Sequence, residues 1–381
     1  MLAPFTIKAT PKIHFGIGCS QQLVNILEEG SRRVLLLRGA KGIASAPVAD
    51  ELTRLRIEFE EAAISGEPSI DNINGLFERF KGTRLDAIIA CGGGAVMDSG
   101  KALRFCLTRQ KPLPEKLEMV AADNHSIVSN LPLIAIPTTA GTGAEVTANA
   151  VLQCGNVKKS LRGDHLVPDT ALVDPGLLAS APKKVVLGAG LDALVQIMEA
   201  FTSCKATPYT DALVTPHLTT VPAALRAAVE GQQEDALSVL AWAALFSGLA
   251  LTNGGLGAVH GLASVLGGQL KAPHGLLCGR LFAPVLFINR TRAPRDTLAH
   301  SRISRCISIL EETFATNGAS QDLAGFEDWL RAHHVPTLRD HGADPSTFGS
   351  VAQEAVSASS STKNAIPLTE TDFLSVLHSA F

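Results

Sequence analysis

Two histidines, each followed by glycine, lie in an apolar and glycine-rich stretch of the chain. Residues 253–279 contain His260 and His274 and few other polar side chains that could hydrogen-bond an imidazole. Upstream, Asp192 and Gln196 stand at i and i+4, so a helix would present both side chains on one face. Carboxylate, amide and imidazole groups are ligands for divalent metals. These four residues therefore predict a metal site.

Cys278 follows His274 by four residues and could be taken for a further ligand. The seven cysteines of the chain are scattered and include no CxxC pair, which favours reduced thiols over disulfides or a cysteine zinc site. Cys278 itself stands between leucine and glycine in an apolar segment. We therefore interpret it as a core residue.

Composition narrows the class of protein. A chain of 381 residues with 46% hydrophobic and 18% charged residues is expected to form two domains. Its net charge of -3 and the lack of a basic run argue against nucleic acid or an anionic membrane surface as a partner. The N-terminus has no signal-peptide pattern, and no run of about 18 uninterrupted apolar residues occurs. We therefore expect a cytoplasmic protein with no membrane span and a small-molecule ligand.

The elements that must position these residues differ between the two halves. Apolar runs near 33–38, 85–91 and 131–137 predict buried strands, and the segment 57–63 predicts a further strand. Amphipathic helices are predicted between the strands, with a polar insert at about 108–130. The alternation predicts a parallel sheet with right-handed crossovers. Residues 7–18 predict an edge hairpin. After residue 177 the pattern is helix after helix, including segments near 181–201 and 281–289, which predicts domains at 1–177 and 178–381.

Three small-residue loops follow the predicted strands, at 39–42, 91–94 and 138–145. In an open parallel sheet the carboxyl ends of the strands line the ligand-binding crevice. Consecutive glycines that open a helix let backbone amides approach a phosphate. The spacing matches neither GxGxxG nor the P-loop, and a tight turn or a helix cap by Thr142 is the alternative. We expect the active site in the crevice between the two domains.

Five motifs in order carry a resemblance over nearly the whole chain. They are CGGGAVMDSGKALR, IPTTAGTGAEVT, HLVPDTALVDPGLLASAPKKVVLGAGLDAL, the pair NGGLGAVHGLASVLGG and KAPHGLLCG, and NAIPLT. In this order they resemble the iron-containing (group III, metal-dependent) alcohol dehydrogenase family. The resemblance implies an α/β Rossmann-like nucleotide-binding domain followed by an all-α domain, an architecture shared with dehydroquinate synthase-like enzymes.

The resemblance also implies an activity, a cofactor, a metal and the residues that bind them. The reaction would be NAD(P)-dependent interconversion of a small alcohol and its aldehyde or ketone, with the carbonyl oxygen polarised by a divalent metal such as iron or zinc. It implies a homodimer or larger homo-oligomer. The metal positions would be Asp192, Gln196, His260 and His274, of which Asp192, His260 and His274 are the expected catalytic residues. The expected cofactor contacts are Gly39, Gly92, Gly93, Gly94, Asp98, Thr138, Thr139, Thr142 and Lys159.

Gly39 bears on the choice between NAD and NADP. It closes the first strand, where a carboxylate would bind the ribose 2'-hydroxyl of NAD and repel the 2'-phosphate of NADP. With glycine there and Lys41 nearby, either cofactor fits. Arg280 is a charge in an apolar segment, expected either to bind a carboxylate or phosphonate on the substrate or to form a salt bridge at a domain or subunit contact.

Two positions depart from the family's histidine pattern. Gln196 stands where the second metal ligand is normally histidine, and Ser264 replaces a histidine thought to assist proton transfer. Because an amide oxygen is a harder and weaker donor than imidazole, we expect a weakly bound metal, with an empty site as the alternative. Proton delivery then falls to water, Ser264 or a cofactor hydroxyl.

Three other functions stay open for such a chain. Metal-independent reductases resembling maleylacetate reductase and cyclases resembling dehydroquinate synthase share the scaffold and tolerate changed ligands. A nucleotide-binding protein without catalysis is the third alternative. Turnover of aldehydes and metal content distinguish among them.

Overall fold

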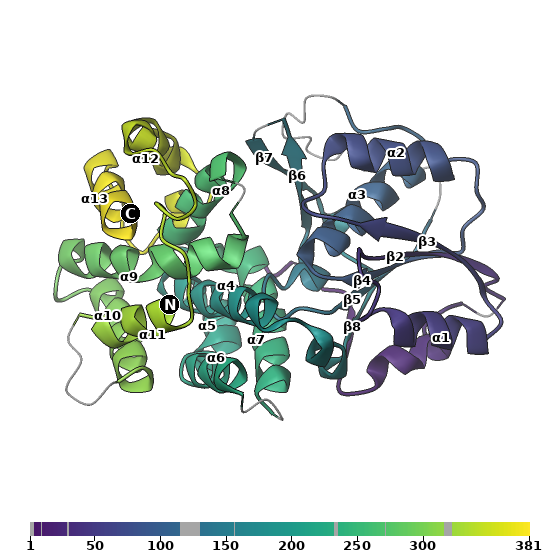
Figure 1. Ribbon diagram of the computed structural model, residues 1–381, viewed down its shortest axis with the longest axis horizontal. Coiled ribbons are helices and arrows are strands. Elements are labelled where there is room, and N and C mark those ends of the chain that lie inside the picture. The colour runs from purple at the N-terminus through teal and green to yellow at the C-terminus, as the bar shows by residue number, and fades with distance from the viewer. Residues whose placement is uncertain are drawn as a thin grey trace. The chain divides into compact units, whose positions relative to one another are not determined.

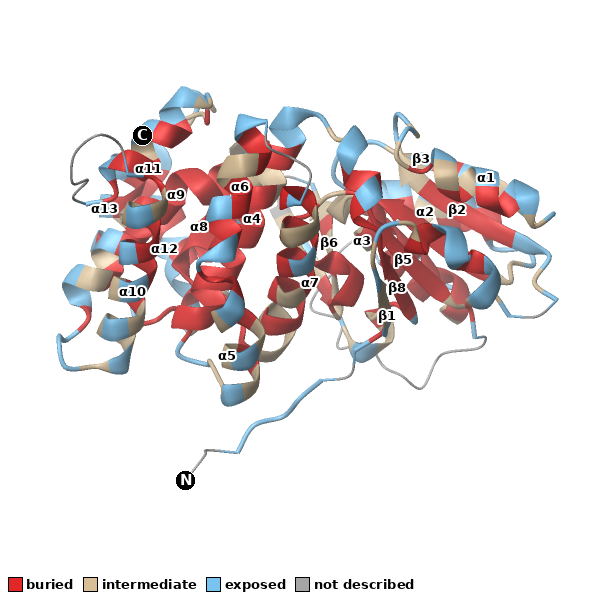
Figure 2. Ribbon diagram, turned by 90° about the horizontal axis from the view of Figure 1, so that it is seen from below, coloured by how far each residue is buried: buried red, intermediate tan, exposed pale blue. Residues whose placement is uncertain are grey.

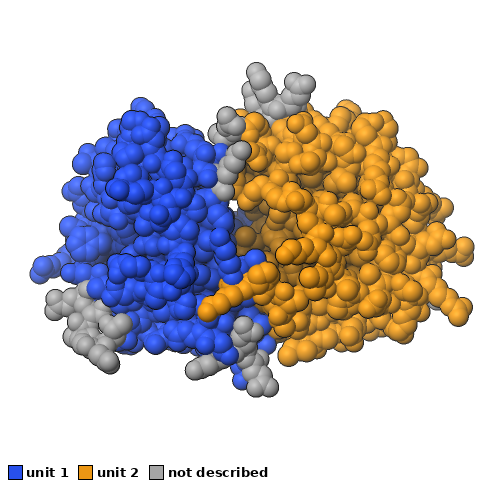
Figure 3. Space-filling view, viewed as in Figure 1, with its two compact units in different colours: residues 1–8, 184–381 blue, residues 9–183 orange. Residues whose placement is uncertain are grey.

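The computed structural model describes residues 4–8, 10–28, 30–114, 130–155, 157–231, 235–270, 272–315 and 322–381. The chain forms two compact units (Figure 3): unit 2 is Ala9–Lys183, and unit 1 is Lys184–Phe381 with the segment Met1–Lys8. The division falls close to the predicted boundary at residue 177, which itself stays a prediction.

Unit 2 is built on a six-stranded sheet in which all neighbouring strands are parallel, as predicted. The strand order is β1-β8-β5-β4-β2-β3. The strands are β1 (Lys12–Phe15), β2 (Arg33–Gly39), β3 (Glu58–Ile64), β4 (Ala87–Gly92), β5 (Leu133–Pro137) and β8 (Thr170–Val173). The expected hairpin at 7–18 is wrong, because β1 is an edge strand that pairs with β8, the last strand of the sheet in chain order.

Helices cover both faces of this sheet. Alternation along β2 sends Val34 and Leu36 into one core with the helices η1 and α1, and Leu35 and Leu37 into the other with α2 and α3. Figure 1 shows α2 and α3 on one side of the strands and α1 on the other, and the strands are largely buried in Figure 2. These helices are η1 (Cys19–Asn25), α1 (Ala46–Arg54), α2 (Ile70–Phe80) and α3 (Gly94–Arg109).

The sheet has its topological switch point between β2 and β4. These strands are neighbours, but β3 lies on the far side of β2 while β5 and β8 continue beyond β4. The carboxyl ends at a switch point form the usual ligand crevice of an open α/β sheet. Gly39 and Gly92 therefore end two strands at the position where a cofactor is expected.

The region at 149–162 forms an antiparallel hairpin, β6 (Asn149–Cys154) with β7 (Val157–Arg162), where the sequence predicted irregular strands and loops. Of the predicted polar insert at 108–130, residues 115–129 lie outside the described residues. The short 3₁₀ helices η3 (Ala144–Val146) and η4 (Asp164–Leu166) precede β6 and β8, and η5 (Pro175–Ser180) follows β8.

Unit 1 is helical, as predicted. Its longer helices are α4 (Lys183–Thr202), α6 (Thr220–Glu230), α7 (Ala236–Gly254), α8 (Ala258–Leu270), α9 (His274–Arg292), α10 (Leu298–Thr313), α12 (Phe348–Ser357) and α13 (Glu370–Ala380). Shorter ones are α5 (Pro208–Val214), α11 (Ala324–Ala332), η6 (Thr215–His217), η7 (Pro345–Thr347) and η8 (Ser361–Lys363). The predicted helix at 281–289 instead begins at His274, seven residues earlier, so the histidine lies on a helix rather than in a loop.

Two helices of unit 1 are long and apolar enough to cross a membrane by length and hydropathy. They are α4 and α7, with mean hydropathy 1.5 in the relevant window, of which 83% and 61% is buried inside the protein. Core helices of soluble proteins meet the same criteria, and burial of this extent identifies α4 and α7 as core helices.

Candidate functional site

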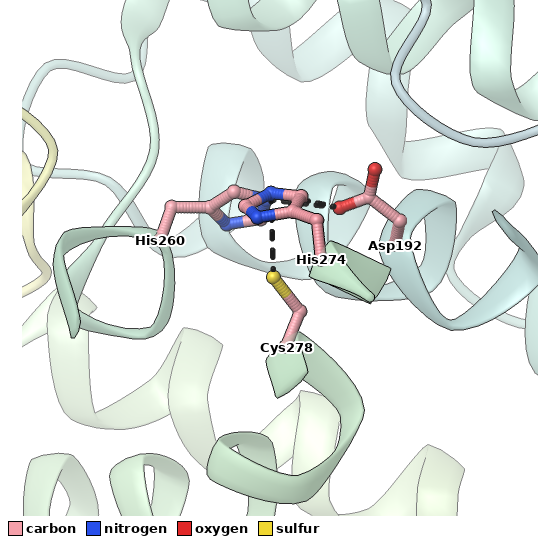
Figure 4. Close-up of side chains that lie close together, drawn as sticks. All are labelled: Asp192, His260, His274 and Cys278. Carbon is pink, nitrogen blue, oxygen red and sulfur yellow. Dashed lines mark hydrogen bonds and ion pairs between the residues drawn. The ribbon is translucent and has the colours of Figure 1, made fainter. Parts of the chain in front are cut away.

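Four side chains converge in unit 1 on a point between α4, α8 and α9. Asp192, His260, His274 and Cys278 each offer one ligand atom, and these atoms all lie within 4.8 Å of one another. Oδ1 of Asp192 lies 3.2 Å from Nε2 of His260 and 3.6 Å from Nε2 of His274. Figure 4 shows the side chains directed toward one another. Asp192, His260 and His274 therefore form a candidate metal-binding site.

Close contact between α4 and α9 brings Asp192 and His274 together. A Cβ added at Gly275 would collide with the backbone oxygen of Gly188, and one at Gly279 would lie 2.7 Å from Leu191. The two helices can pack this closely because α9 carries glycine, which has no side chain, at both positions. His274 and Cys278 then lie one turn apart on the face of α9 that meets α4.

A second carboxylate of α4, Glu199, orients His260. Oε2 of Glu199 accepts a hydrogen bond from Nδ1 of His260 at 2.6 Å, and Oε1 accepts one from the backbone N–H of Val259 at 2.7 Å. This assignment leaves Nε2 of His260 directed toward Asp192, in the carboxylate–histidine arrangement typical of metal sites. Glu199 was not among the site residues predicted from the sequence. Its signal was a buried charge seven residues after Asp192, hence on the same face of an apolar helix.

The start of α8 is held in place by the NAIPLT motif. Oδ1 of Asn364 accepts a hydrogen bond from the N–H of Ala258 at 3.1 Å, and Asn364 also bonds to Asn289. Cβ atoms at Gly257 and Gly261 would clash with Glu199 and Asn364 or with Ser361. The glycines around His260 thus allow the first turn of α8 to approach these partners closely.

Gln196 contacts this cluster with its amide nitrogen. Oε1 of Gln196 accepts a hydrogen bond from the hydroxyl of Ser247 at 3.0 Å, while the amide group donates to Asp192. The oxygen that would bind a metal is thus engaged elsewhere, and the ligand role of Gln196 stays a prediction. Ser264 is exposed, and its hydroxyl donates to the backbone oxygen of Gly261 at 2.7 Å.

The four converging groups perturb one another's pKa values. Burial alone would raise the pKa of Asp192 and of Cys278, but the imidazoles of His274 and His260 outweigh it and lower both. Burial would lower the pKa of His260, yet the Cys278 sulfur, Asp192 and Glu199 hold it well above its usual value. The pKa of His274 is raised because Cys278 and Asp192 overcome the effect of its burial. Opposite charges thus stabilise each other here.

The interpretation of Cys278 as a core residue was incomplete. Its thiol is buried, but Sγ lies 3.6 Å from Nε2 of His274, within the cluster.

Arg280, by contrast, is structural. Its guanidinium donates to Oε2 of Glu327 at 2.8 Å and to the backbone oxygens of Val335 and Pro336. Arg280 therefore forms a salt bridge, but within unit 1 and not at the domain or subunit contact that the sequence suggested.

In unit 2 the predicted cofactor loops lie side by side. The N–H of Thr138 donates to the oxygen of Gly92 at 2.9 Å. A Cβ at Gly93 would lie 3.3 Å from Oγ1 of Thr139, and one at Gly94 would lie 3.2 Å from Oγ1 of Thr142. Among the described residues no side chain caps the N-terminus of α3, which Gly93 precedes. Its first amides are therefore available to a phosphate, and these loops fit a nucleotide.

Two further predicted cofactor positions differ in exposure. Oδ2 of Asp98 accepts a hydrogen bond from the N–H of Val151 at 3.0 Å, and burial raises the pKa of Asp98 to about 6. Lys159 is exposed on β7, whereas its neighbour Lys158 forms an ion pair with Glu67 at 3.0 Å. Asp98 thus helps to join α3 to β6, and Lys159 is the lysine of this pair that is accessible to a ligand.

Comparison with known proteins matches both units. The sequence model described as "Iron-containing alcohol dehydrogenase" matches residues 10–175, and the one described as "Fe-containing alcohol dehydrogenase family, C-terminal" matches residues 186–381. Long-chain-alcohol dehydrogenase 1 of Geobacillus thermodenitrificans is 28% identical over 97% of this chain and 95% of that protein. Probable alcohol dehydrogenase EutG of Escherichia coli is 32% identical over 76% of this chain and 72% of that protein.

A solved structure gives the same result for the fold. The iron-containing alcohol dehydrogenase of Thermococcus thioreducens superposes over 99% of both chains with a TM-score of 0.80 and 26% sequence identity. The similarity in sequence and in structure extends over both units.

Proposed function

The chain belongs to the iron-containing alcohol dehydrogenase family, and from this premise we propose that it interconverts a small alcohol and its aldehyde or ketone with NAD or NADP. The observation that carries the proposal is the convergence of Asp192, His260 and His274, with Glu199 orienting His260. One carboxylate and two imidazoles are a donor set that fits a divalent metal. When bound, the metal would polarise the substrate oxygen and the nicotinamide would exchange the hydride.

The residues of unit 1 have separable roles in this proposal. Asp192, His260 and His274 would hold the ion, and Asp192 would supply negative charge that offsets the charge of the ion. Glu199 fixes the ring of His260 so that Nε2 is presented as a ligand. Because Ser264 replaces a histidine and donates to its own helix, proton exchange with the substrate oxygen is assigned to water.

The residues of unit 2 bind and orient the nucleotide. The amides that follow Gly92, Gly93 and Gly94 would bind the pyrophosphate, and the hydroxyls of Thr138, Thr139 and Thr142 would bind phosphate or ribose. Gly39 and Asp98 border the same carboxyl edge of the sheet, and Lys159 adds positive charge. A homodimer or larger assembly and a cytoplasmic location belong to the same proposal.

The test is turnover combined with metal content. Purified protein is analysed for bound metals and assayed for oxidation of NADH and NADPH with short aldehydes and with aldehydes that carry a carboxylate. We expect turnover with at least one of the cofactors and its loss in Asp192→Asn, with the metal lost in parallel. Absence of turnover with every carbonyl compound, with or without added metals, would refute the proposal.

A matched variant separates site loss from misfolding. Asp328→Asn removes a carboxylate that is paired at the surface with Arg331 in the same unit. Because surface ion pairs contribute little, this variant is expected to keep both metal and turnover. If Asp328→Asn lost activity as Asp192→Asn does, the loss would reflect stability rather than the metal site.

A further inference from the structure

Cys278 lies where the candidate metal site needs another donor. Asp192, His260 and His274 supply three ligand atoms, and the oxygen of Gln196 is engaged with Ser247. The sulfur of Cys278 is the fourth atom of the cluster, projecting from α9 one turn after His274 (Figure 4).

We propose that the Cys278 thiolate is a metal ligand together with Asp192, His260 and His274, and that this ligand set selects zinc. This inference rests on the proposed function, because it concerns the same metal. It goes beyond the proposed function, because it assigns Cys278 in place of Gln196 as the fourth ligand and zinc as the preferred metal.

Three of the six distances between the four ligand atoms are close to those of a tetrahedral site, and all four atoms lie within 4.8 Å of one another. Bonds of about 2.0 Å to nitrogen and oxygen and about 2.3 Å to sulfur place tetrahedral ligand atoms roughly 3.3–3.5 Å apart. In the structure, Oδ1 of Asp192 lies 3.2 Å from Nε2 of His260, and Nε2 of His274 lies 3.6 Å from Oδ1 of Asp192 and from Sγ of Cys278. These side chains can therefore close around an ion with small movements.

The elements that carry the ligands are fixed independently of a metal. Gly275 and Gly279 allow α9 to pack closely on α4, which places Cys278 opposite Asp192. Glu199 and Asn364 hold the first turn of α8, which places His260. A thiol that merely filled the core would need no such convergence with a carboxylate and two imidazoles.

The chemistry of sulfur predicts the metal preference. Thiolate is a soft ligand that favours zinc over oxygen-preferring ions such as magnesium and manganese. Binding replaces the thiol proton of Cys278, which leaves to solvent, so that Asp192 and the thiolate together balance the two positive charges of the ion. With four protein ligands, the substrate oxygen would bind as a fifth ligand, a coordination number that catalytic zinc sometimes adopts.

Cobalt(II) reports directly on a thiolate ligand. The full-length protein is freed of metal with a chelator and titrated anaerobically with Co²⁺, and the absorption spectrum is recorded for the wild type, Cys278→Ala and Cys306→Ala. Cys306 is a buried cysteine of the same unit, on α10, and serves as the matched control. Zinc affinity is then measured by competition with a chromophoric chelator.

We expect wild type and Cys306→Ala to show thiolate-to-cobalt charge transfer in the near ultraviolet at one equivalent. Cys278→Ala should keep the visible bands of bound cobalt, lose the charge-transfer band, and bind zinc at least about tenfold more weakly. Gln196→Ala should keep the charge-transfer band.

Two results would overturn the inference, and only the second would also contradict the proposed function. Cobalt bound without charge transfer in the wild type, or with the band retained in Cys278→Ala, would exclude the thiolate and leave the proposed function intact. A wild-type protein that binds neither cobalt nor zinc would overturn the inference and the metal-dependent part of the proposed function together.

Discussion

Glu199 lies 2.6 Å from Nδ1 of His260, and its proposed role in orienting that ring toward a metal can be tested at one residue. Glu199→Gln keeps the size of the side chain but replaces a charged acceptor of the Nδ1 hydrogen bond with a neutral amide. We expect cobalt and zinc affinity to fall about 10–100-fold, as for other partners of ligating histidines. Glu354→Gln, an exposed carboxylate of α12, is the control. Equal affinities in the two variants would show that Glu199 does not orient the ligand.

Gly39 tests cofactor choice. A Cβ there meets no atom of the described residues within 4 Å, so Gly39→Asp fits sterically. The new carboxylate would repel the 2'-phosphate of NADP by roughly 1.4 kcal/mol or more, a tenfold loss. We expect KM for NADPH to rise by that factor while KM for NADH changes little. Gly82→Asp adds the same charge before the amino end of β4 and should alter neither KM value. If Gly39→Asp raised KM for both cofactors, Gly39 would not lie beside the 2'-position that distinguishes them.

The residues also show what local sequence could and could not reveal. Asp192, His260 and His274 were predicted as one cluster because their types and spacing suggest chemistry without knowledge of the fold. Cys278 was interpreted as a core residue because its neighbours in the sequence are apolar. Its role depends on how α9 meets α4, a contact between segments far apart in sequence.

At the scale of elements, the crossing of α4 and α9 assembles the site. Gly275→Ala would place a methyl group against the backbone oxygen of Gly188, which cannot move as a side chain can. We expect a loss of about 1–3 kcal/mol of unfolding free energy and weaker cobalt binding, because α9 must shift away from Asp192. Denaturant unfolding and cobalt titration measure the two effects.

The control for this crossing is Gly349→Ala in α12. A Cβ there meets no atom of the described residues within 4 Å, so alanine should stabilise that helix by roughly 0.5–1 kcal/mol. If Gly275→Ala lowered stability and cobalt binding no more than Gly349→Ala, the close contact between α4 and α9 would not determine the geometry of the site.

Elements were predicted well wherever burial alone determines them. β2 and β4 lie within a residue or two of the predicted strands, because strands covered on both faces are continuous apolar runs. β1 was assigned to a hairpin because its partner β8 is distant in the chain. The start of α9 was missed because Pro273 and the glycines that follow it obscure the helical pattern, although proline is well suited to a helix N-terminus.

In the molecule as a whole, the predicted cofactor loops lie in unit 2 and the candidate metal site lies in unit 1. Unit 2 also contains a buried charged cluster near its predicted cofactor loops. Nζ of Lys101 donates to Oγ1 of Thr147 and to the oxygen of Asn149, both at 2.8 Å, and burial lowers its pKa to about 8. Burial raises the pKa of Glu145 to about 7. Folding of the molecule is therefore linked to pH through this cluster.

Glu145→Gln isolates that linkage. The folded-state pKa of Glu145 lies above its value of 4.5 in the unfolded chain, so between these values the folded protein binds more protons and its stability falls as pH rises. The amide introduced by the substitution has no proton to lose, so the unfolding free energy of the variant minus that of the wild type should grow from near zero at about pH 4.5 to roughly 2–3 kcal/mol by about pH 8. Denaturant unfolding at several pH values measures the difference. Glu58→Gln, at an exposed position of β3, is the control. A difference that stayed constant with pH for Glu145→Gln would show that folding does not change the pKa of this carboxyl group.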